Sequence, residues 1–443
     1  MNVTQIFLAS TLYGAATLAA GIDAGAFPPA HRRILLTSNH SVTHEITPGL
    51  TGMPGFDALR PRFDEVRDWN AVIAPQHPSV WTPRPEDVPL WERQLRAAWG
   101  LGEDRVELVV ESLQVPPAQG LCQVFPGAAV DVYADGLMSY GPTRVRLDPR
   151  IGMRVRRVLH LDLVPGLEPL LLTEFGVRAQ SLPSADFLKV LAELTAYGRP
   201  PADVGESPAV LLGQYLAALE LISAAEEEDL HVEMVRGAYA RGHRELVFKP
   251  HPSAPAAYSR RAEEEARRLG ARLTVIAEPV LAETLYERLR PALVVGCFST
   301  GLLTASELYG IPVARTGTEA MLERLTPYEN SNRIPLVLVD ALLPDLAGAD
   351  RPPGAGGDLP ALVAAVGFTM QPRVLADRRA EAERYLAAGP TPETARYFRR
   401  RRLTALALPG GVPARLSFLP RNPAVRRAGR RLLRRFPVLR RLL

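Results

Sequence analysis

Short apolar runs alternate with longer segments of helical periodicity along most of this 443-residue chain. The runs of the first half that predict buried strands are QIFLA, RILLTS, NAVIA, VELVVES, VDVYA and RVLHLDLV. Those of the second half are PAVLLGQ, RELVFKP, ARLTVIA, PALVVGC, IPVAR and IPLVLVD. Helical patterns such as VPLWERQLRAAWG and AAYSRRAEEEARRLG lie between them. Nearly continuous apolar strands separated by helices are typical of parallel sheets that helices cover on both faces.

The order of these elements predicts two doubly wound, Rossmann-like α/β domains, residues 1–200 and 201–345, that face each other across a cleft. The seam between them falls in YGRPPADVGESP, residues 197–208. The Gly- and Pro-rich stretch AGADRPPGAGGDLP predicts a linker. A helical pattern over about 359–388 follows it, so residues 346–395 are expected to form a linker and a helix that crosses back to the first domain.

The compartment is indicated by the N-terminus and by the cysteines. The apolar segment TQIFLASTLYGAATLAAGI lacks the basic residues that precede the apolar part of a signal peptide, and it predicts a strand followed by a helix from about Tyr13. No apolar run reaches the roughly 18 residues of a membrane span. Cys122 and Cys297 have no metal-ligand spacing. We therefore expect a mature protein in a reducing compartment, the cytoplasm.

Charge is distributed unevenly between the body of the chain and its C-terminal tail, residues 396–443. The whole chain carries a formal net charge of +4, but the tail contains 15 arginines and no acidic residue, so residues 1–395 carry −11. Arginine pairs recur in the tail at a spacing of four, which predicts a basic amphipathic helix. Such a helix is typical of peripheral attachment to a membrane surface. The alternatives are a helix packed on the acidic body and, third, a helix that binds nucleic acid, and no nucleic-acid partner is expected.

Polar residues gather where the predicted strands end, which is where open α/β sheets bind ligands. They are Glu111 and Ser112, Asp135 and Gly136, Lys249 and His251, and Ser299 and Thr300. Each has a purely structural alternative, because Asp-Gly is a common turn, Ser-Thr a common helix N-cap and His-Pro a common strand end. Glu111 could equally be a solvated residue at the rim of the sheet. The coincidence of all four at strand ends favours a ligand site between the domains.

Three short motifs, YADG at 133–136, KPHP at 249–252 and FST at 298–300, follow one another in this order. With them the sequence resembles the bacterial sialyltransferases of GT-B fold, and most closely the alpha-2,8-polysialyltransferase-like family. The resemblance extends from the N-terminal strand to about Glu319 and leaves out the basic tail. It implies transfer of sialic acid from CMP-sialic acid to a hydroxyl of a glycan or glycolipid, with inversion and with neither a metal nor another cofactor.

The resemblance also implies roles for the motif residues. Asp135 is the expected base that takes the proton of the acceptor hydroxyl, and His251 is the expected acid that protonates the leaving phosphate. Lys249 is one of only two lysines among 52 basic residues, and it supplies a compact charge for the donor. The family commonly has two acids before the glycine, whereas this chain has Ala134 at the first position. Glu111 is therefore the reserve base.

Further residues are expected to bind the substrates. Ser299 and Thr300, at the start of a helix, suit the phosphate of CMP, and Gly136 completes the turn after Asp135. Gly213, Gln214 and Glu283 are expected near the donor, although Glu283 could equally be an exposed helix residue. Ser10 and Asn39, at the ends of the first two strands, are expected to face the acceptor.

Two other functions fit the same residues. One is a GT-B transferase or a sugar-nucleotide epimerase that uses another nucleotide sugar. The other is a catalytically inactive binding protein that the tail docks on a membrane, a reading that the departure at Ala134 keeps open.

Overall fold

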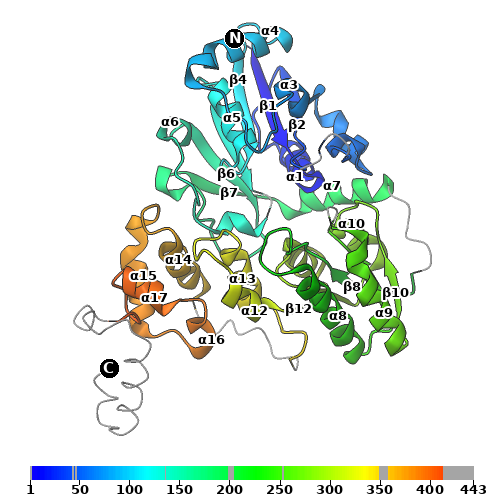
Figure 1. Ribbon diagram of the computed structural model, residues 1–443. Helices are drawn as coiled ribbons and strands as arrows, with labels where there is room; N and C mark the ends of the chain where they lie inside the picture. The colour runs from blue at the N-terminus through cyan, green and yellow to red at the C-terminus, as the bar shows by residue number, and fades with distance from the viewer. Residues whose placement is uncertain are drawn as a thin grey trace.

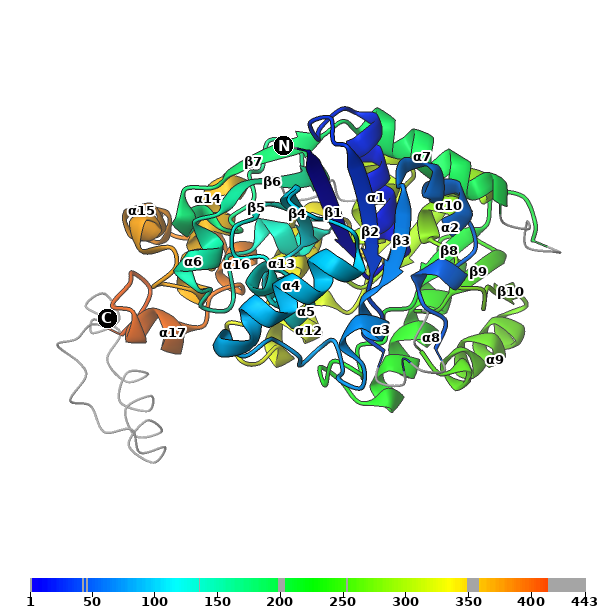
Figure 2. The ribbon, with the colours of Figure 1, turned by 90° about the horizontal axis from the view of Figure 1, so that it is seen from above.

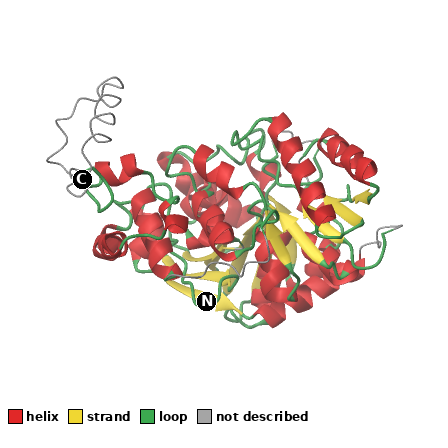
Figure 3. Cartoon of the chain, turned by 90° about the horizontal axis from the view of Figure 1, so that it is seen from below, coloured by secondary structure: helices red, strands yellow, loops and turns green. Residues whose placement is uncertain are grey.

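The computed structural model describes residues 2–41, 44, 47–134, 136–197, 204–251, 254–348 and 358–412. Two parallel sheets lie one above the other in the molecule, and a third group of helices lies beside the lower sheet (Figure 1). Helices surround the strands of both sheets (Figure 3). Two doubly wound parallel sheets in one chain are the α/β, GT-B arrangement that the sequence predicts.

The N-terminal sheet has seven parallel strands in the order β3-β2-β1-β4-β5-β6-β7, which Figure 2 shows across the upper part of the view. The strands are β1 Val3–Ala9, β2 Arg32–Thr37, β3 Glu65–Asp68, β4 Arg105–Glu111, β5 Ala129–Ala134, β6 Val155–Leu161 and β7 Arg178–Leu182. The helices are α1 Leu12–Asp23, α2 Phe56–Leu59, α3 Trp69–Ile73, α4 Val88–Ala98, α5 Pro116–Val124, α6 Pro149–Gly152 and α7 Ser184–Tyr197. Because all strands run parallel, their carboxyl ends share one edge of the sheet.

The C-terminal sheet has five parallel strands in the order β10-β9-β8-β11-β12. The strands are β8 Ala209–Leu212, β9 Glu245–Lys249, β10 Arg272–Val275, β11 Leu293–Gly296 and β12 Val313–Arg315. The helices are α8 Ala224–Ala240, α9 Arg260–Leu269, α10 Ala282–Leu289, α11 Thr300–Leu303, α12 Thr318–Arg324 and α13 Arg333–Leu342. The change of direction in the strand order falls beside β8, so loops diverge there and leave room for a ligand.

Four further helices form the C-terminal unit beside the lower sheet (Figure 1). They are α14 Leu359–Met370, α15 Arg379–Ala388, α16 Pro392–Ala395 and α17 Arg400–Ala405. Helix α14 reaches the first domain, because a side chain at Gly367 would meet Leu170 and because Gln371 Nε2 donates to the carbonyl of Arg144 at 3.1 Å. None of the helices in the described part of the chain has the length and apolarity needed to cross a membrane.

The two domains share buried packing. One cluster of buried apolar residues extends from β1 and α1 of the first domain through β8 and β11 of the second and on to α14. Helix α7 packs against both α1 and α10, and Arg62 pairs with Glu193 of α7 at 2.8 Å. The expected domain boundary at residue 200 lies in 198–203, outside the described residues, as do most of the expected linker and residues 413–443 of the tail.

Two of the predicted strands are wrong, because both segments are helices. IPLVLVD belongs to α13, in which residues from Arg333 to Asp340 are buried. An apolar run of this length does not distinguish a strand buried on both faces from a helix buried all round. NAVIA belongs to α3, since the Asp68 side chain accepts from the amide of Asn70 and caps a helix there. The polar strands β3 and β7, which the sequence did not predict, lie at the edges of the sheet.

Candidate active site

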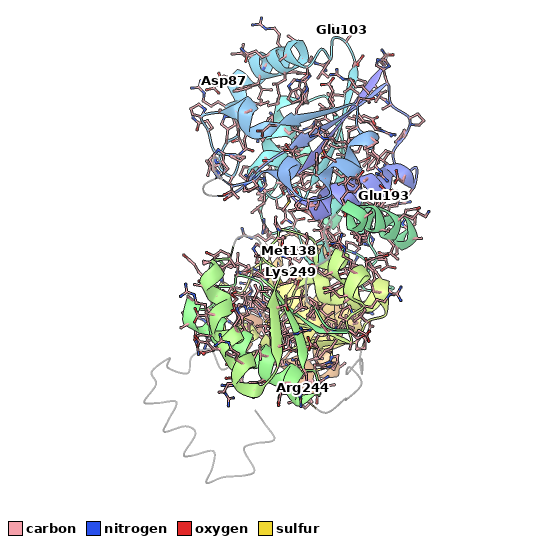
Figure 4. The ribbon with its side chains drawn as sticks, turned by 90° about the vertical axis from the view of Figure 1, so that its right-hand side faces the viewer. Asp87, Glu103, Met138, Glu193, Arg244 and Lys249 are labelled. Carbon is pink, nitrogen blue, oxygen red and sulfur yellow. The ribbon has the colours of Figure 1, made fainter. Side chains whose placement is uncertain are left out.

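Most of the residues expected to bind the donor lie along one edge of the C-terminal sheet. Gly213 and Gln214 follow β8, Lys249 ends β9, and Ser299 caps the helix that follows β11. These three strands are neighbours in the order β9-β8-β11, and all run parallel. Their carboxyl ends therefore bring the glycine, the amide, the ammonium and the hydroxyl groups to one place. Figure 4 shows Lys249 where the two lobes meet, the region in which Met138 of the first domain is also labelled.

The Ser299–Thr300 turn opens a helix with its amides directed at this edge. The Ser299 side chain accepts from the amide of Gly301 at 3.2 Å, as an N-cap does. The helix continues from α11 into a π-helical turn, Thr304–Leu308. Gln214 Oε1 accepts from the amide of Phe298 at 2.7 Å, so the loop after β8 is tied to the turn after β11. Amides and hydroxyls at a helix start favour an anionic ligand.

Lys249 is buried, with only 5% of its surface exposed. Its ammonium donates to the carbonyl of Pro250 at 3.0 Å. Burial lowers the pKa of Lys249 to about 8, and the charges of Glu278 and Glu283 oppose this shift. A compact, buried ammonium group is well suited to donate to an incoming phosphate or carboxylate.

Glu283, in the first turn of α10, is buried as well, at 4% exposure. The interpretation of this residue as an exposed helix glutamate is therefore wrong. Thr304 Oγ1 donates to Glu283 Oε1 at 2.7 Å, across from the π-helical turn. Burial raises the pKa of Glu283, while the hydrogen bond from Thr304 and the charge of Lys249 lower it. The carboxyl group thus links α10 to the helix that begins at Thr300.

His251 follows β9 and is exposed to solvent. Its ring lies 6.3 Å from the ring of Tyr215, at an interplanar angle of 38°. Desolvation by the surrounding protein lowers the pKa of His251, the charge of Lys249 lowers it further, and the charge of Glu227 raises it. A bound anion would favour the protonated ring, so protonation of His251 would be coupled to anion binding.

The first domain meets this edge at the end of β5. Asp135, the expected base, lies outside the described residues. The next residue, Gly136, is so close to the second domain that a Cβ atom there would lie 3.1 Å from Thr300 Oγ1. The amide of Leu137 donates to the same hydroxyl at 3.5 Å. The turn after β5 and the turn after β11 therefore touch, and the carboxyl edges of the two sheets face each other at this point.

Glu111 and Ser10, at the neighbouring ends of β4 and β1, form a pair. Ser10 Oγ donates to Glu111 Oε2 at 2.8 Å. The hydroxyl of Tyr133 lies 3.5 Å from the same oxygen and donates to the carbonyl of Leu8 at 3.0 Å. The reserve base is thus partly buried and accepts a hydroxyl hydrogen bond.

Asn39, expected to face the acceptor, has its side chain bonded within its own loop. Its amide nitrogen donates to the carbonyl of Thr47 at 3.0 Å, and its side-chain oxygen accepts from the amide of Ser41 at 3.0 Å. Asn39 and Asn70 also exchange hydrogen bonds at 2.9 Å in both directions. Asn39 therefore holds its own loop together. The residue lies at the wall of a polar cavity of about 540 Å³ at the ends of β2 and β3.

Three side chains near this edge were not singled out by the sequence: Tyr215, Glu227 and Tyr258. A tyrosine and a glutamate in segments of ordinary composition give no local signal, and only the positions of their neighbours make them noticeable. Among the described residues, no group of three or more His, Cys, Asp and Glu side chains gathers in a way that could hold a metal ion.

Two facing Rossmann-like domains, with polar groups gathered at the strand ends of the second, form the GT-B fold. The sequence profile of the alpha-2,8-polysialyltransferase (POLYST) family matches residues 5–318, and the chain belongs to this family. The protein is therefore a sialyltransferase. No curated protein sequence matches the chain.

Solved structures with similar folds include two sialyltransferases and an epimerase. The alpha/beta-galactoside alpha-2,3-sialyltransferase of Photobacterium phosphoreum is 11% identical, with a TM-score of 0.40 over 79% of this chain and 97% of that one. The sialyltransferase of Photobacterium damselae is 12% identical, with a TM-score of 0.41 over 76% and 96%. The UDP-N-acetylglucosamine 2-epimerase of Rickettsia bellii is 9% identical, with a TM-score of 0.42 over 71% and 79%. All three TM-scores lie below 0.5, which is too low to assign a shared function.

Proposed function

We propose that the protein transfers sialic acid from CMP-sialic acid to a hydroxyl of a sialylated glycan or glycolipid, with inversion and without a metal ion. The observation that supports this proposal best is the contact between Gly136 and Thr300. It puts the turn that follows Asp135 in the sequence against the turn that offers hydroxyl and amide groups to an anion. A donor bound at the second turn would then have its reacting carbon near residues of the first domain.

The donor phosphate is proposed to lie between Lys249 and the Ser299–Thr300 turn. The ammonium of Lys249 and the helix start both favour an anion, and no second buried lysine exists in the chain, since Lys189 is exposed. Glu283 is proposed to support this site, because it accepts a hydrogen bond from Thr304 and its charge raises the pKa of Lys249. Gly213 and Gln214 complete the wall of the site, as the hydrogen bond from Phe298 to Gln214 supports.

The reaction is proposed as a single displacement. The acceptor oxygen forms a bond to the anomeric carbon while the bond from that carbon to the phosphate oxygen breaks, which inverts the configuration. Asp135 takes the proton of the acceptor hydroxyl, with Glu111 in reserve, and His251 gives its proton to the departing phosphate of CMP. The proton from His251 and the positive charge of Lys249 offset the charge that develops on CMP, the task that a metal ion has in other transferases.

The basic tail is proposed to hold the enzyme on the inner face of an anionic membrane. Arg400 and Arg401 of α17, in the described part of the tail, are exposed, and ten of the tail's 15 arginines lie beyond residue 412. Membrane-bound glycolipid acceptors would then be concentrated near the cleft. A cytoplasmic protein with peripheral attachment also agrees with the two buried, unpaired cysteines, Cys122 and Cys297.

The proposal is tested by incubating the purified protein with CMP-sialic acid and a panel of glycan acceptors, with and without EDTA. We expect transfer to sialylated acceptors that EDTA leaves unchanged. His251→Ala and Asp135→Ala should each lower kcat at least 100-fold, whereas Lys189→Ala, which changes the exposed lysine, should not. Thermal melts should show stabilisation by CMP but not by UDP or GDP. Transfer that survives both substitutions unchanged, or stabilisation by UDP alone, would overturn the proposal.

A further inference from the structure

Tyr215 occupies a backbone conformation that is unfavourable for any residue with a side chain. Its φ angle is +54°, in the left-handed region where glycine is the usual residue. The residue lies two positions after Gly213, in the loop that follows β8 at the donor edge of the sheet. Backbone strain of this kind persists only where the surrounding structure holds it, and it is concentrated at functional sites.

The strain is held by a buried carboxylate. Glu227, on α8, is fully buried, and its two oxygens accept from the amides of Leu216 at 2.6 Å and Ala217 at 2.8 Å. Both amides directly follow Tyr215, so the carboxylate fixes the chain at the point where it turns. Hydrogen bonds from two amides to a buried carboxylate are among the stronger ones in proteins.

The ring of Tyr215 lies beside two other rings at the same edge of the sheet. Tyr215 lies 6.3 Å from His251, at 38°, and 5.7 Å from Tyr258, at 74°. Tyr258 belongs to the turn that follows the His-Pro segment, and its carbonyl accepts from His231 Nδ1 at 3.3 Å. Helix α8 therefore holds two segments near His251. Glu227 holds the segment that contains Tyr215, and His231 contacts the carbonyl of Tyr258.

We propose that Tyr215 is a positioning residue for His251, and that Glu227 holds it in place from α8. The proposal rests on the proposed function, in which His251 protonates the leaving phosphate. His251 follows the end of a strand and is exposed, so the contact with Tyr215 is one of those that set the direction of its ring. The tilted Tyr215 ring, 6.3 Å away, lies within the range over which aromatic rings interact favourably, so it restricts that direction.

The contact has a second consequence for the loop itself. Gln214, next to Tyr215, accepts from the amide of Phe298, so one short loop holds both the acid and the phosphate-binding turn. A change in the loop would therefore misplace both groups relative to each other. Misplacement by about 1 Å is enough to lower a rate by about 100-fold.

The test compares Tyr215→Ala, Tyr215→Phe and Glu227→Gln, with Glu228→Gln as the control on the same helix. We expect Tyr215→Ala to lower kcat by about 10- to 100-fold with KM for CMP-sialic acid within about twofold. Tyr215→Phe keeps the ring and should restore at least half of the rate. Glu227→Gln should lower kcat as well, because an amide accepts with one atom only, and Glu228→Gln should not.

Two further measurements separate positioning from a general loss of structure. In a His251→Ala background, Tyr215→Ala should have no additional effect on kcat, because the two residues act as a unit. The proton signals of the His251 ring should shift in Tyr215→Ala and stay in Tyr215→Phe. Additive losses, a Phe variant as slow as the Ala variant, or unchanged His251 signals would overturn the proposal. An inactive wild-type protein whose His251 signals still respond to Tyr215→Ala would overturn the proposed function and support the contact.

Discussion

Lys249 combines burial with a charge that the proposed function requires. Because burial lowers its pKa to about 8, the ammonium is present below that pH and is lost as the pH rises through it. We expect kcat/KM for CMP-sialic acid to fall above about pH 8 for this reason. Lys249→Arg keeps its charge at high pH, so its profile should stay flat there, with a maximum roughly tenfold lower because the fork fits the site less well.

The control for this experiment is Lys189→Arg, which changes the other lysine of the chain. Lys189 is exposed and pairs with Asp186 at 2.8 Å on the outer side of α7. Its variant should keep the fall above pH 8. A fall that remains in Lys249→Arg would assign the alkaline titration to a different group.

His231 gives a prediction about stability. It is 3% exposed, and burial lowers its pKa from the usual 6.5, although the hydrogen bond to Tyr258 opposes the shift. In the unfolded chain His231 takes up a proton near pH 6.5, whereas in the folded protein its lowered pKa opposes protonation. The contribution of neutral His231 to the free energy of unfolding is therefore present above that pH and is lost as the pH falls. We expect a lower melting temperature at pH 5.5 than at 7.5, and a smaller difference in His231→Gln. His31→Gln, at an exposed histidine, is the control and should keep the wild-type difference in melting temperature. The same difference in His231→Gln as in wild type would contradict the prediction.

At the residue scale the sequence identified several positions but not their surroundings. Lys249 was noticeable because lysine is rare in this chain, and its place at the end of a strand followed from the apolar pattern. That Glu283 is buried and bound to Thr304 could not be predicted, because both neighbours come from elements brought together only by folding. The strained conformation of Tyr215 has the same origin, since Glu227, which accepts from the two amides after it, lies 12 residues further on and on a separate helix.

At the scale of elements, α13 is the helix on which the C-terminal unit depends. Its Asp340 is 4% exposed and accepts from Tyr397 at 2.8 Å and from Thr318 at 2.6 Å. The carboxylate also pairs with Arg396 at 2.5 Å and with Arg315 at 3.2 Å. One buried carboxylate thus joins β12, α12 and the approach to α17.

We expect Asp340→Ala to lower the free energy of unfolding by about 1–3 kcal/mol, because the buried hydroxyls of Thr318 and Tyr397 lose their acceptor. Limited proteolysis should then cleave near Arg396 first, since the anchor of that segment is removed. Urea unfolding and mass spectrometry of the fragments measure both effects. Asp377→Ala, at an exposed aspartate, is the control, and a loss as small as the control's would show that the network contributes little.

The element scale is also where the sequence was least informative. The strands of both sheets were predicted where short apolar runs contain β-branched residues, and the error at α13 arose because its run IPLVLVD has the same composition. Edge strands β3 and β7 are short and polar, so they lack the apolar run on which the prediction depends. The helical stretch predicted from 359 to 388 is two helices, α14 and α15.

At the scale of the whole molecule, the basic tail gives a prediction about location. We expect the full-length protein to bind vesicles of phosphatidylglycerol but not of phosphatidylcholine, and binding to weaken at high salt because the charges are screened. Replacing the arginine pairs 426/427, 430/431 and 434/435 by glutamine should abolish binding and leave transfer to soluble acceptors intact. Vesicle sedimentation measures the first and an activity assay the second. Binding that survives the replacement would exclude the tail as the anchor.

The sequence by itself determined the α/β class, the two parallel sheets, the polar residues at their strand ends and the family. Periodicity and short motifs record these properties locally, because each depends on residues close together in the chain. Only the tertiary structure decided that Gly136 touches Thr300, that Glu283 is buried, that Asn39 serves its own loop and that Glu227 clamps Tyr215. Such contacts join elements that are distant in sequence or lie on different layers, and no local pattern specifies which side chains meet when those layers pack.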